Sequence, residues 1–554
     1  MNGGIPRSAE KIPTILSRLN SQAGTALEAQ GVRPTEHEVM PRCSQILDIP
    51  TALFLLAALI FLYTFLFVPP FIPLYFNGSS FLYLAPGQRM YEGQTIYRDF
   101  FEFVTPATAL VHFFLFKLFG LRLWIPPVEC LLLGLGLAWL GVVIAKKLMR
   151  PSLALLPSAI FLLGMREFLG PPTHHLYSLL AASAALASLM ERRTPARIAA
   201  AGFFCGLSAC FTQTCGSAVV VGFGVFLWWE SRRRQEGWRK LLKKEAWLVT
   251  SFLATLLAVN AYFIWKAGLA RFLWCTVVFV LKYFPKQADE NTFQVFTESF
   301  PSVVPLRSFL RYNIEQWLFL YAIIPFIPIL FFTRYWRESG KKPVEYWERP
   351  MLVAMAGSFM LLSVAPSPMS YRMAGSALPA LILLGWLLDS PRKLARALAP
   401  AFAAGVLLVA LHAVARRQPI PVGILATPQG KLAFTDQTAY QEYTWIQQHT
   451  RPAEYFYQAS SPDSYFILNL RNPTPLPYIL NSGYTTPGQV AEVIRGLEQH
   501  PVRYILWTPD DPDKIPKWED PSDDHLGPLQ DYIHSHYRRV KVFADFTEVW
   551  EKKG

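Results

Sequence analysis

Apolar residues fill most of this chain in long stretches that are divided by short polar gaps. A helix needs about 20 mostly apolar residues to cross a membrane, and eleven stretches reach or approach that length. They lie near residues 50–69, 124–145, 152–166, 176–190, 198–211, 215–229, 247–265, 316–333, 351–365, 374–389 and 398–414. The pattern therefore predicts an α-helical polytopic membrane protein with about eleven spans, whose membrane domain covers residues 50–415.

The composition agrees with this prediction. Of the 554 residues, 52% are hydrophobic and only 16% are charged, whereas about 25% are charged in ordinary soluble domains. The mean hydropathy is +0.25. These values exclude a disordered chain, a fibrous chain and a single soluble enzyme domain.

The basic residues predict the orientation in the membrane, because cytoplasmic loops carry an excess of Lys and Arg. If the N-terminal segment 1–49 is cytoplasmic, every second gap is cytoplasmic as well, and these gaps hold 21 Lys and Arg residues. The gaps are 146–150, 191–197, 230–244, 333–349 and 390–396. The net charge of +13 and the pI of about 9.4 therefore indicate membrane topology rather than nucleic-acid binding.

This orientation places the loops 70–123 and 266–315 and the C-terminal part 416–554 outside the cytoplasm. The C-terminal part has no apolar run long enough to span, and its 14 basic residues nearly balance 17 acidic ones. Helical patterns alternate there with strand patterns, at 436–449, 454–459, 487–499, 503–508, 526–537 and 538–550. We therefore expect a small extracytoplasmic α/β domain over residues 416–554.

The loop 70–123 has the most informative sequence. Residues 76–120 read FNGSSFLYLAPGQRMYEGQTIYRDFFEFVTPATALVHFFLFKLFG, a run rich in aromatic residues that predicts short helices on the membrane surface. Acidic groups in such surroundings are costly if they are buried without a role, although Arg98 and Asp99 could simply form a local surface pair. The charged residues of this stretch include Arg89, Glu92, Arg98, Asp99 and Glu102.

The order of these features resembles a known family. A first span is followed by a long outer loop with the motifs YLAPGQRMYEGQTIYRDFFEFVTP and FKLFG, and then by a span that ends in basic residues. This layout is similar to the multi-spanning GT-C glycosyltransferases, particularly bacterial members related to protein O-mannosyltransferases and aminoarabinose transferase. The resemblance covers the first two-thirds of the chain by motif and the whole chain by layout.

The resemblance implies an enzyme of the bacterial plasma membrane that moves a sugar from a polyprenyl-phosphate donor to an extracytoplasmic glycan, lipid or protein. In that family a carboxylate of the first outer loop acts as base or orients the acceptor, because the acceptor hydroxyl loses a proton as it attacks the anomeric carbon. Basic residues hold the donor phosphate and stabilise its developing charge. A divalent metal ion sometimes assists, and no other cofactor is implied.

The family's acid cannot be carried over at its usual place. Many members have an acidic pair four residues before a Tyr, and counting back from Tyr83 this place holds Ser79 and Ser80. The resemblance therefore points to Asp99, within YRDFFEF, as the catalytic carboxylate, with Glu102 as its partner. If this segment is helical, the two acids share a face because they are three positions apart. The departure also leaves open a member with altered or lost activity.

Several polar residues that face outward are candidates for contact with the substrate or its phosphate. His174 and His175 stand together before a span and could bind phosphate or take part in acid–base work, or they could be structural. Arg372 lies at an outer helix end against the positive-inside bias, where it could also snorkel. The full set of candidates is Arg98, Arg166, His174, His175, Gln213, Tyr283 and Arg372.

Alternatives remain open at this point. Gln213 either contacts the substrate or forms a tight polar turn between two spans, and Tyr283 belongs to a stretch, 281–296, that is either a mobile lid or a solvated loop. The whole chain could instead be a transporter or flippase of lipid-linked sugars, or a non-catalytic membrane assembly protein. The spans are nearly free of charge and the polar residues gather at their outer ends, which favours surface chemistry over transport.

Overall fold

The computed structural model divides the chain into two units, residues 1–52 and 53–554. The described residues are 48–75, 81–164, 169–284, 318–389, 400–401, 403–405, 407–408, 420–459, 462–479, 485–508 and 526–554. The contacts that build the site all lie within the second unit.

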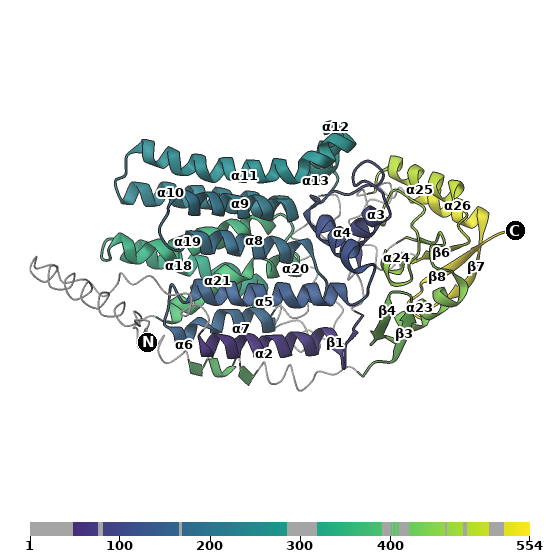
Figure 1. Ribbon diagram of the computed structural model, residues 1–554, viewed down its shortest axis with the longest axis horizontal. Coiled ribbons are helices and arrows are strands. Elements are labelled where there is room, and N and C mark those ends of the chain that lie inside the picture. Colours follow the sequence, from purple (N-terminus) through teal and green to yellow (C-terminus); the bar gives the residue numbers. More distant parts are fainter. Residues whose placement is uncertain are drawn as a thin grey trace, which may run out of the picture. The chain divides into compact units, whose positions relative to one another are not determined.

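Helices account for most of the described chain between residues 49 and 388. They are α2 (Ile49–Leu66), η2 (Leu82–Leu84), α3 (Ala85–Tyr91), α4 (Ala107–Phe119), α5 (Ile125–Ala145), α6 (Pro151–Ala154), α7 (Leu156–Gly164), α8 (His174–Leu189), α9 (Pro195–Phe211), α10 (Gln213–Arg233), α11 (Trp238–Ala267), α12 (Leu269–Leu273), η4 (Trp274–Val278), α13 (Phe279–Lys282), η6 (Leu318–Ile323), α18 (Ile324–Glu338), α19 (Val344–Val364), α20 (Ser370–Ala374) and α21 (Ala377–Leu388). Figure 1 shows the long helices running side by side, with α9 packed along α8 and α11 and with α10 packed along α19.

Small residues allow these helices to approach closely. A Cβ atom added to Gly202 of α9 would lie 2.2 Å from the carbonyl oxygen of Leu248 in α11. One added to Gly216 of α10 would lie 2.1 Å from the backbone nitrogen of Ala209 in α9. Close backbone contact of this kind supports helix association inside a membrane, where lipid tails are as apolar as the side chains.

Five helices of the described residues are long and apolar enough to cross a membrane: Ile49–Leu66, Ile125–Ala145, Gln213–Arg233, Trp238–Ala267 and Phe319–Glu338. Five more of the predicted stretches coincide with helices that are shorter or less apolar, in α6 with α7, α8, α9, α19 and α21. The remaining stretch, 398–414, lies largely outside the described residues. The chain is therefore a helical membrane protein, and the count of eleven spans stays a prediction.

Four of the gaps that the sequence predicts to be cytoplasmic are joined by ion pairs. Arg193 lies 3.2 Å from Glu230 and 3.8 Å from Glu348, so it links three of the gaps. Lys147 of a fourth gap lies 2.7 Å from Glu191. These gaps therefore lie at the same end of the helices, as the alternation of spans requires.

The C-terminal part contains the helices and strands that the pattern predicts. Four strands form a sheet in the order β5-β6-β8-β7, in which β5 pairs in parallel with β6 and the other pairs are antiparallel. Thr486 caps its helix through a capping box with Gln489, which satisfies backbone N–H groups at the helix start. The elements are β3 (Gly423–Thr427), β4 (Gly430–Phe434), α23 (Gln437–His449), β5 (Tyr457–Gln458), α24 (Asp463–Ile467), α25 (Pro487–Gln499), β6 (Tyr504–Trp507), α26 (Gly527–His536), β7 (Tyr537–Val542) and β8 (Glu548–Lys552).

The loop 70–123, which we call the first loop, packs against the C-terminal part through two hydrophobic clusters. One cluster includes Tyr97 and Phe101 of the first loop with Ile505 of β6. In the other, the ring of Phe116 lies 5.3 Å from that of Phe466 in α24. These aromatic residues fix the position of the loop that carries the acids.

The first loop contains short helices, as expected, but the segment between α3 and α4 is not helical. Tyr97 adopts a φ of 69°, in the left-handed region that breaks a helix. The N–H of Phe101 donates to the carbonyl of Pro475 at 2.8 Å instead of to a helical partner. The expectation that Asp99 and Glu102 share a helical face is therefore wrong.

Candidate functional site

Arg98 and Asp99 form the local pair that the sequence left open. Nε and Nη2 of Arg98 donate to Oδ1 and Oδ2 of Asp99, each at 2.8 Å. Asp99 Oδ2 also accepts the N–H of Thr95 at 2.6 Å. Hydrogen bonding to Arg98 holds the pKa of the Asp99 carboxyl below its usual range. Asp99 is therefore ionised, and its proton affinity is low.

Glu102 lies in different surroundings. Its Oε1 accepts the N–H of Phe103 at 2.9 Å and that of Val104 at 3.0 Å. Burial raises the pKa of Glu102 to about 7, although these two N–H groups oppose the shift. A general base works best when its pKa lies near the operating pH. Glu102 is therefore better suited than Asp99 to accept a proton.

Gln213 connects the Glu102 segment to the helices. Its Nε2 donates to the carbonyl of Phe103 at 2.7 Å. The preceding hydroxyl, on Thr212, donates to the carbonyl of His174 at 3.3 Å. The short connection between α9 and α10 therefore contacts both the first loop and the start of α8.

The two histidines open α8, and Thr173 caps this helix. The ring of His174 lies 4.0 Å from that of His175 and 5.1 Å from that of Tyr83 in the first loop. The ring of His175 lies 5.5 Å from that of Tyr371 in α20. The histidine pair thus bridges the first loop and α20.

Arg372 connects α20 back to the segment that carries Glu102. Its guanidinium lies 5.1 Å from the centre of the Phe284 ring and donates to the hydroxyl of Ser367. The ring of Phe284 lies 5.3 Å from that of Phe103, beside Glu102. The Arg372 side chain is therefore held between Ser367, just before α20, and Phe284, just after α13.

Contacts through neighbouring residues therefore link six of the nine candidates, although these come from distant parts of the chain. Tyr283 joins through Phe279, whose ring lies 5.7 Å from that of Tyr283 and 5.8 Å from that of Phe103. The six residues, which we call the Glu102 cluster, are Glu102, His174, His175, Gln213, Tyr283 and Arg372. Arg98 and Asp99 pair with each other instead, and Arg166, Ser79 and Ser80 lie outside the described residues.

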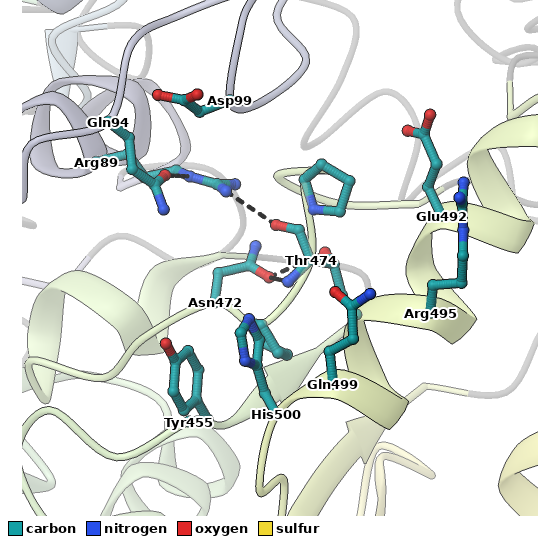
Figure 2. Close-up of a pocket in the computed structure, with 13 residues that line it drawn as sticks. Arg89, Gln94, Asp99, Tyr455, Asn472, Thr474, Glu492, Arg495, Gln499 and His500 are labelled. Carbon is teal, nitrogen blue, oxygen red and sulfur yellow. Dashed lines mark hydrogen bonds between the residues drawn. The ribbon is translucent and has the colours of Figure 1, made fainter.

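A cavity of about 320 Å³ is lined by the first loop and the C-terminal part, and Asp99 is one of its lining residues. Figure 2 shows Arg89 pointing across it to Thr474, whose carbonyl accepts a hydrogen bond from Nη2 at 2.9 Å. Nε of Arg89 donates to Gln94 at 2.6 Å. Burial lowers the pKa of Arg89 to about 10. Sequence reasoning noted this Arg but did not assign it to a site, because only the tertiary contacts bury it.

A second polar group that sequence reasoning missed lies between α4, α5 and α8. The hydroxyl of Tyr177 donates to Oε1 of Glu129 at 2.7 Å, and Nε2 of His112 lies 3.4 Å from the same oxygen. Nδ1 of His112 lies 2.9 Å from the carbonyl of Tyr83. A carbonyl can only accept, so Nδ1 carries a proton. This group therefore anchors Tyr83, which contacts His174.

The described residues contain no group of three or more His, Cys, Asp or Glu side chains that could hold a metal ion.

No protein-family model and no curated protein matches the sequence, but solved structures do. ArnT from Cupriavidus metallidurans bound to undecaprenyl phosphate aligns with 92% of this chain and 98% of its own, at 13% identity and a TM-score of 0.53. Its apo form aligns with 90% and 97% of the two chains, at 13% identity and a TM-score of 0.52. The chain shares the fold of ArnT. Since the alignments cover at least nine-tenths of the chain, they include parts of both the helical region and residues 416–554.

An oligosaccharyltransferase from Archaeoglobus fulgidus, tethered with an acceptor peptide, aligns with 92% of this chain and 75% of its own. Its identity is 13% and its TM-score is 0.47.

Proposed function

We propose that this protein is a membrane glycosyltransferase that moves a sugar from a polyprenyl-phosphate donor to an extracytoplasmic acceptor. The fold shared with ArnT supports a lipid-linked donor, since ArnT is bound to undecaprenyl phosphate. The observation that carries the proposal is the Glu102 cluster. In it, the segment that carries a carboxyl with a pKa of about 7 is linked through neighbouring residues to two histidines and Arg372.

In the proposed reaction the acceptor hydroxyl oxygen attacks the anomeric carbon of the sugar. The bond from this carbon to the phosphate oxygen breaks, and the polyprenyl phosphate leaves with the bonding electrons. Glu102 takes the hydroxyl proton as general base. The Arg372 guanidinium, with Gln213 and the histidines as hydrogen-bonding groups, stabilises the charge that develops on the departing phosphate.

This assignment exchanges the roles that the sequence suggested for the two acids. Asp99 is paired with Arg98 and holds its proton weakly, so we assign it to the acceptor side of the site rather than to proton transfer. Both hydrogen bonds that the Glu102 carboxylate accepts are on Oε1. Among the described residues Oε2 accepts none, and we assign this oxygen to the acceptor hydroxyl.

We place the Glu102 cluster and residues 416–554 at the outer face of a bacterial plasma membrane with about eleven spans. Gln213 begins α10, and Glu230 lies near its other end. The two ends of a helix of 21 residues lie about 30 Å apart, the thickness of a membrane core. Glu230 belongs to the joined basic gaps, which the positive-inside rule assigns to the cytoplasm.

The test uses the purified full-length protein in lipid nanodiscs with undecaprenyl phosphate linked to radiolabelled hexoses or pentoses. We expect release of undecaprenyl phosphate and transfer of the label. Glu102→Gln should lower kcat by ~10²–10⁴-fold because the general base is lost. Glu345→Gln, at an exposed position on α19, is the matched control and should leave kcat unchanged. Equal release by Glu102→Gln and the unaltered protein would contradict the assignment of the base.

A second assay separates this proposal from a flippase. The protein is reconstituted into vesicles with the same labelled lipid on one face only. Movement of intact lipid-linked sugar to the other face, without cleavage, would overturn the transferase proposal in favour of transport.

A further inference from the structure

We propose that the cavity between the first loop and α25 binds the acceptor, and that this acceptor is a neutral carbohydrate. The proposal rests on the proposed transferase function and narrows its acceptor to one chemical class. The cavity is lined by residues that are far apart in sequence: three between positions 89 and 99 of the first loop, and Tyr455 with nine residues between positions 472 and 500 of the C-terminal part (Figure 2). Its volume of about 320 Å³ lies at the lower end of the range for small-molecule sites.

The charges of the lining side chains balance. Arg89 and Arg495 contribute two positive charges, and Asp99 and Glu492 contribute two negative ones. A phosphate or carboxylate ligand would be expected to meet an excess of cations, and a lipid chain would desolvate these charged groups without compensation. The balance therefore favours a neutral polar ligand.

The cavity also offers hydrogen-bond donors and acceptors together. Gln94 and Gln499 each carry an amide, which both donates and accepts. Figure 2 shows Gln94 on the side of the first loop and Gln499 on α25, across the cavity. Hydroxyl groups of a sugar also donate and accept, so paired amides and charged groups suit a polyol better than they suit a ligand that only accepts.

One buried hydrogen-bond donor at this site, on Arg89, has no partner among the described residues. The Arg89 side chain is only 7% exposed, and it is held by hydrogen bonds to Gln94 and Thr474 and by the ring of Phe100, 4.6 Å from its guanidinium carbon. Its Nη1 is buried without a hydrogen-bond partner among the described residues. A buried donor without a partner is costly, and a ligand oxygen would satisfy it.

An aromatic pair forms another part of the lining. The rings of Tyr455 and His500 stack at 4.2 Å with an angle of 5° between their planes, and both residues are partly exposed. A rigid, amphipathic aromatic surface costs little conformational entropy on binding. Such an aromatic surface suits the C–H face of a sugar ring, while the hydroxyl groups around the edge of the ring remain available for hydrogen bonds.

The cavity lies within reach of the proposed base. Asp99 lines the cavity and Glu102 is three residues further along, which is at most about 11 Å of extended chain. The N–H of Phe101, between them, donates to the carbonyl of Pro475 in the cavity wall at 2.8 Å. The wall of the cavity and the proposed base therefore belong to one short stretch of the first loop.

The test measures binding of the purified full-length protein to an array of defined neutral oligosaccharides, with phosphorylated sugars, peptides and phospholipid vesicles as the other probes. We expect neutral oligosaccharides to bind. The double variant Arg495→Ala/Gln499→Ala should weaken this binding by at least tenfold, and Gln499→Trp, which fills the cavity, should abolish it. Glu498→Ala is the matched control, since Glu498 is exposed on the same helix and does not line the cavity.

Because binding is measured without a donor, this proposal and the transferase proposal can fail separately. Glycan binding that depends on Arg495 and Gln499 supports the cavity as a carbohydrate site even if no donor is cleaved. Binding only of phosphorylated sugars, peptides or vesicles would overturn it, as would glycan binding that the double variant and Gln499→Trp leave unchanged. Size-exclusion chromatography of each variant excludes loss of folding as the cause.

Discussion

Gln213 donates a hydrogen bond of 2.7 Å from the first turn of α10 to the carbonyl of Phe103, the residue that follows Glu102. This bond fixes the segment that carries the proposed base to the end of a membrane helix. The sequence left open whether Gln213 forms a polar turn or contacts the substrate. The structure shows that Gln213 also supports the first loop.

We expect Gln213→Ala to lower kcat, because the Phe103 carbonyl loses its partner and the Glu102 segment is no longer held. An unsatisfied polar group costs about 1–3 kcal/mol, so a tenfold to hundredfold loss in kcat is expected if the bond holds the active geometry. Release of undecaprenyl phosphate in nanodiscs measures this effect. Gln437→Ala, at an exposed position, serves as the control. An unchanged kcat in Gln213→Ala would show that this hydrogen bond does not hold the active geometry.

The activity should depend on pH through Glu102. Its folded pKa of about 7 means that the base form is present above this pH and is lost below it. We therefore expect kcat/KM to rise as the pH passes upward through about 7 and then to level. In Glu102→Gln the residual rate should lack this rise. The same rise in the variant would show that another group is responsible.

The two acids should differ in their effects. Asp99 is already ionised and paired with Arg98, so Asp99→Asn should leave the rise near pH 7 in place while weakening the acceptor side of the site. Glu102→Gln should cost the larger loss in kcat. Steady-state kinetics on the two variants at pH 6 and pH 8 compare them. A larger kcat loss in Asp99→Asn would instead support Asp99 as the catalytic carboxylate and Glu102 as its partner, as the sequence suggested.

The buried group around Glu129 should contribute to stability. Glu129→Ala leaves the hydroxyl of Tyr177 without its acceptor, at a cost of about 1–3 kcal/mol, whereas Glu129→Gln keeps an oxygen there and should cost less. Thermal unfolding in detergent measures both variants. Glu345→Ala provides an exposed control, and a Glu129→Ala protein that melts like this control would contradict the expectation.

The close packing of α9 and α10 should be sensitive to a single methyl group. Gly216→Ala places a Cβ atom 2.1 Å from the backbone nitrogen of Ala209, and overpacking of this kind typically costs about 1–3 kcal/mol. Gly340→Ala is the matched control, because nothing lies within 4 Å of its added Cβ atom. We expect a lower melting temperature for the first variant only. Equal melting of both would show that the helices separate easily.

Much of the secondary structure follows from local patterns. The apolar stretches predict the positions of the long helices, and Thr486 before Pro487 predicts the start of α25, because capping and periodicity act over only a few residues. The short helices of the first loop are predicted in the same way. The helical face shared by Asp99 and Glu102 is not found, because a tertiary hydrogen bond to Pro475 and the left-handed φ of Tyr97 replace the helix.

By itself, the sequence determined that this is a helical membrane protein, and it identified the residues that the Glu102 cluster joins. Only the tertiary structure decided how the candidates are arranged. The contrast between Glu102 and Asp99 depends on burial and on the hydrogen bonds that each carboxyl accepts, and the burial of Arg89 depends on Thr474, far away in the chain. Proton affinity and burial are properties of surroundings that distant segments build, so no local pattern of residues can specify them.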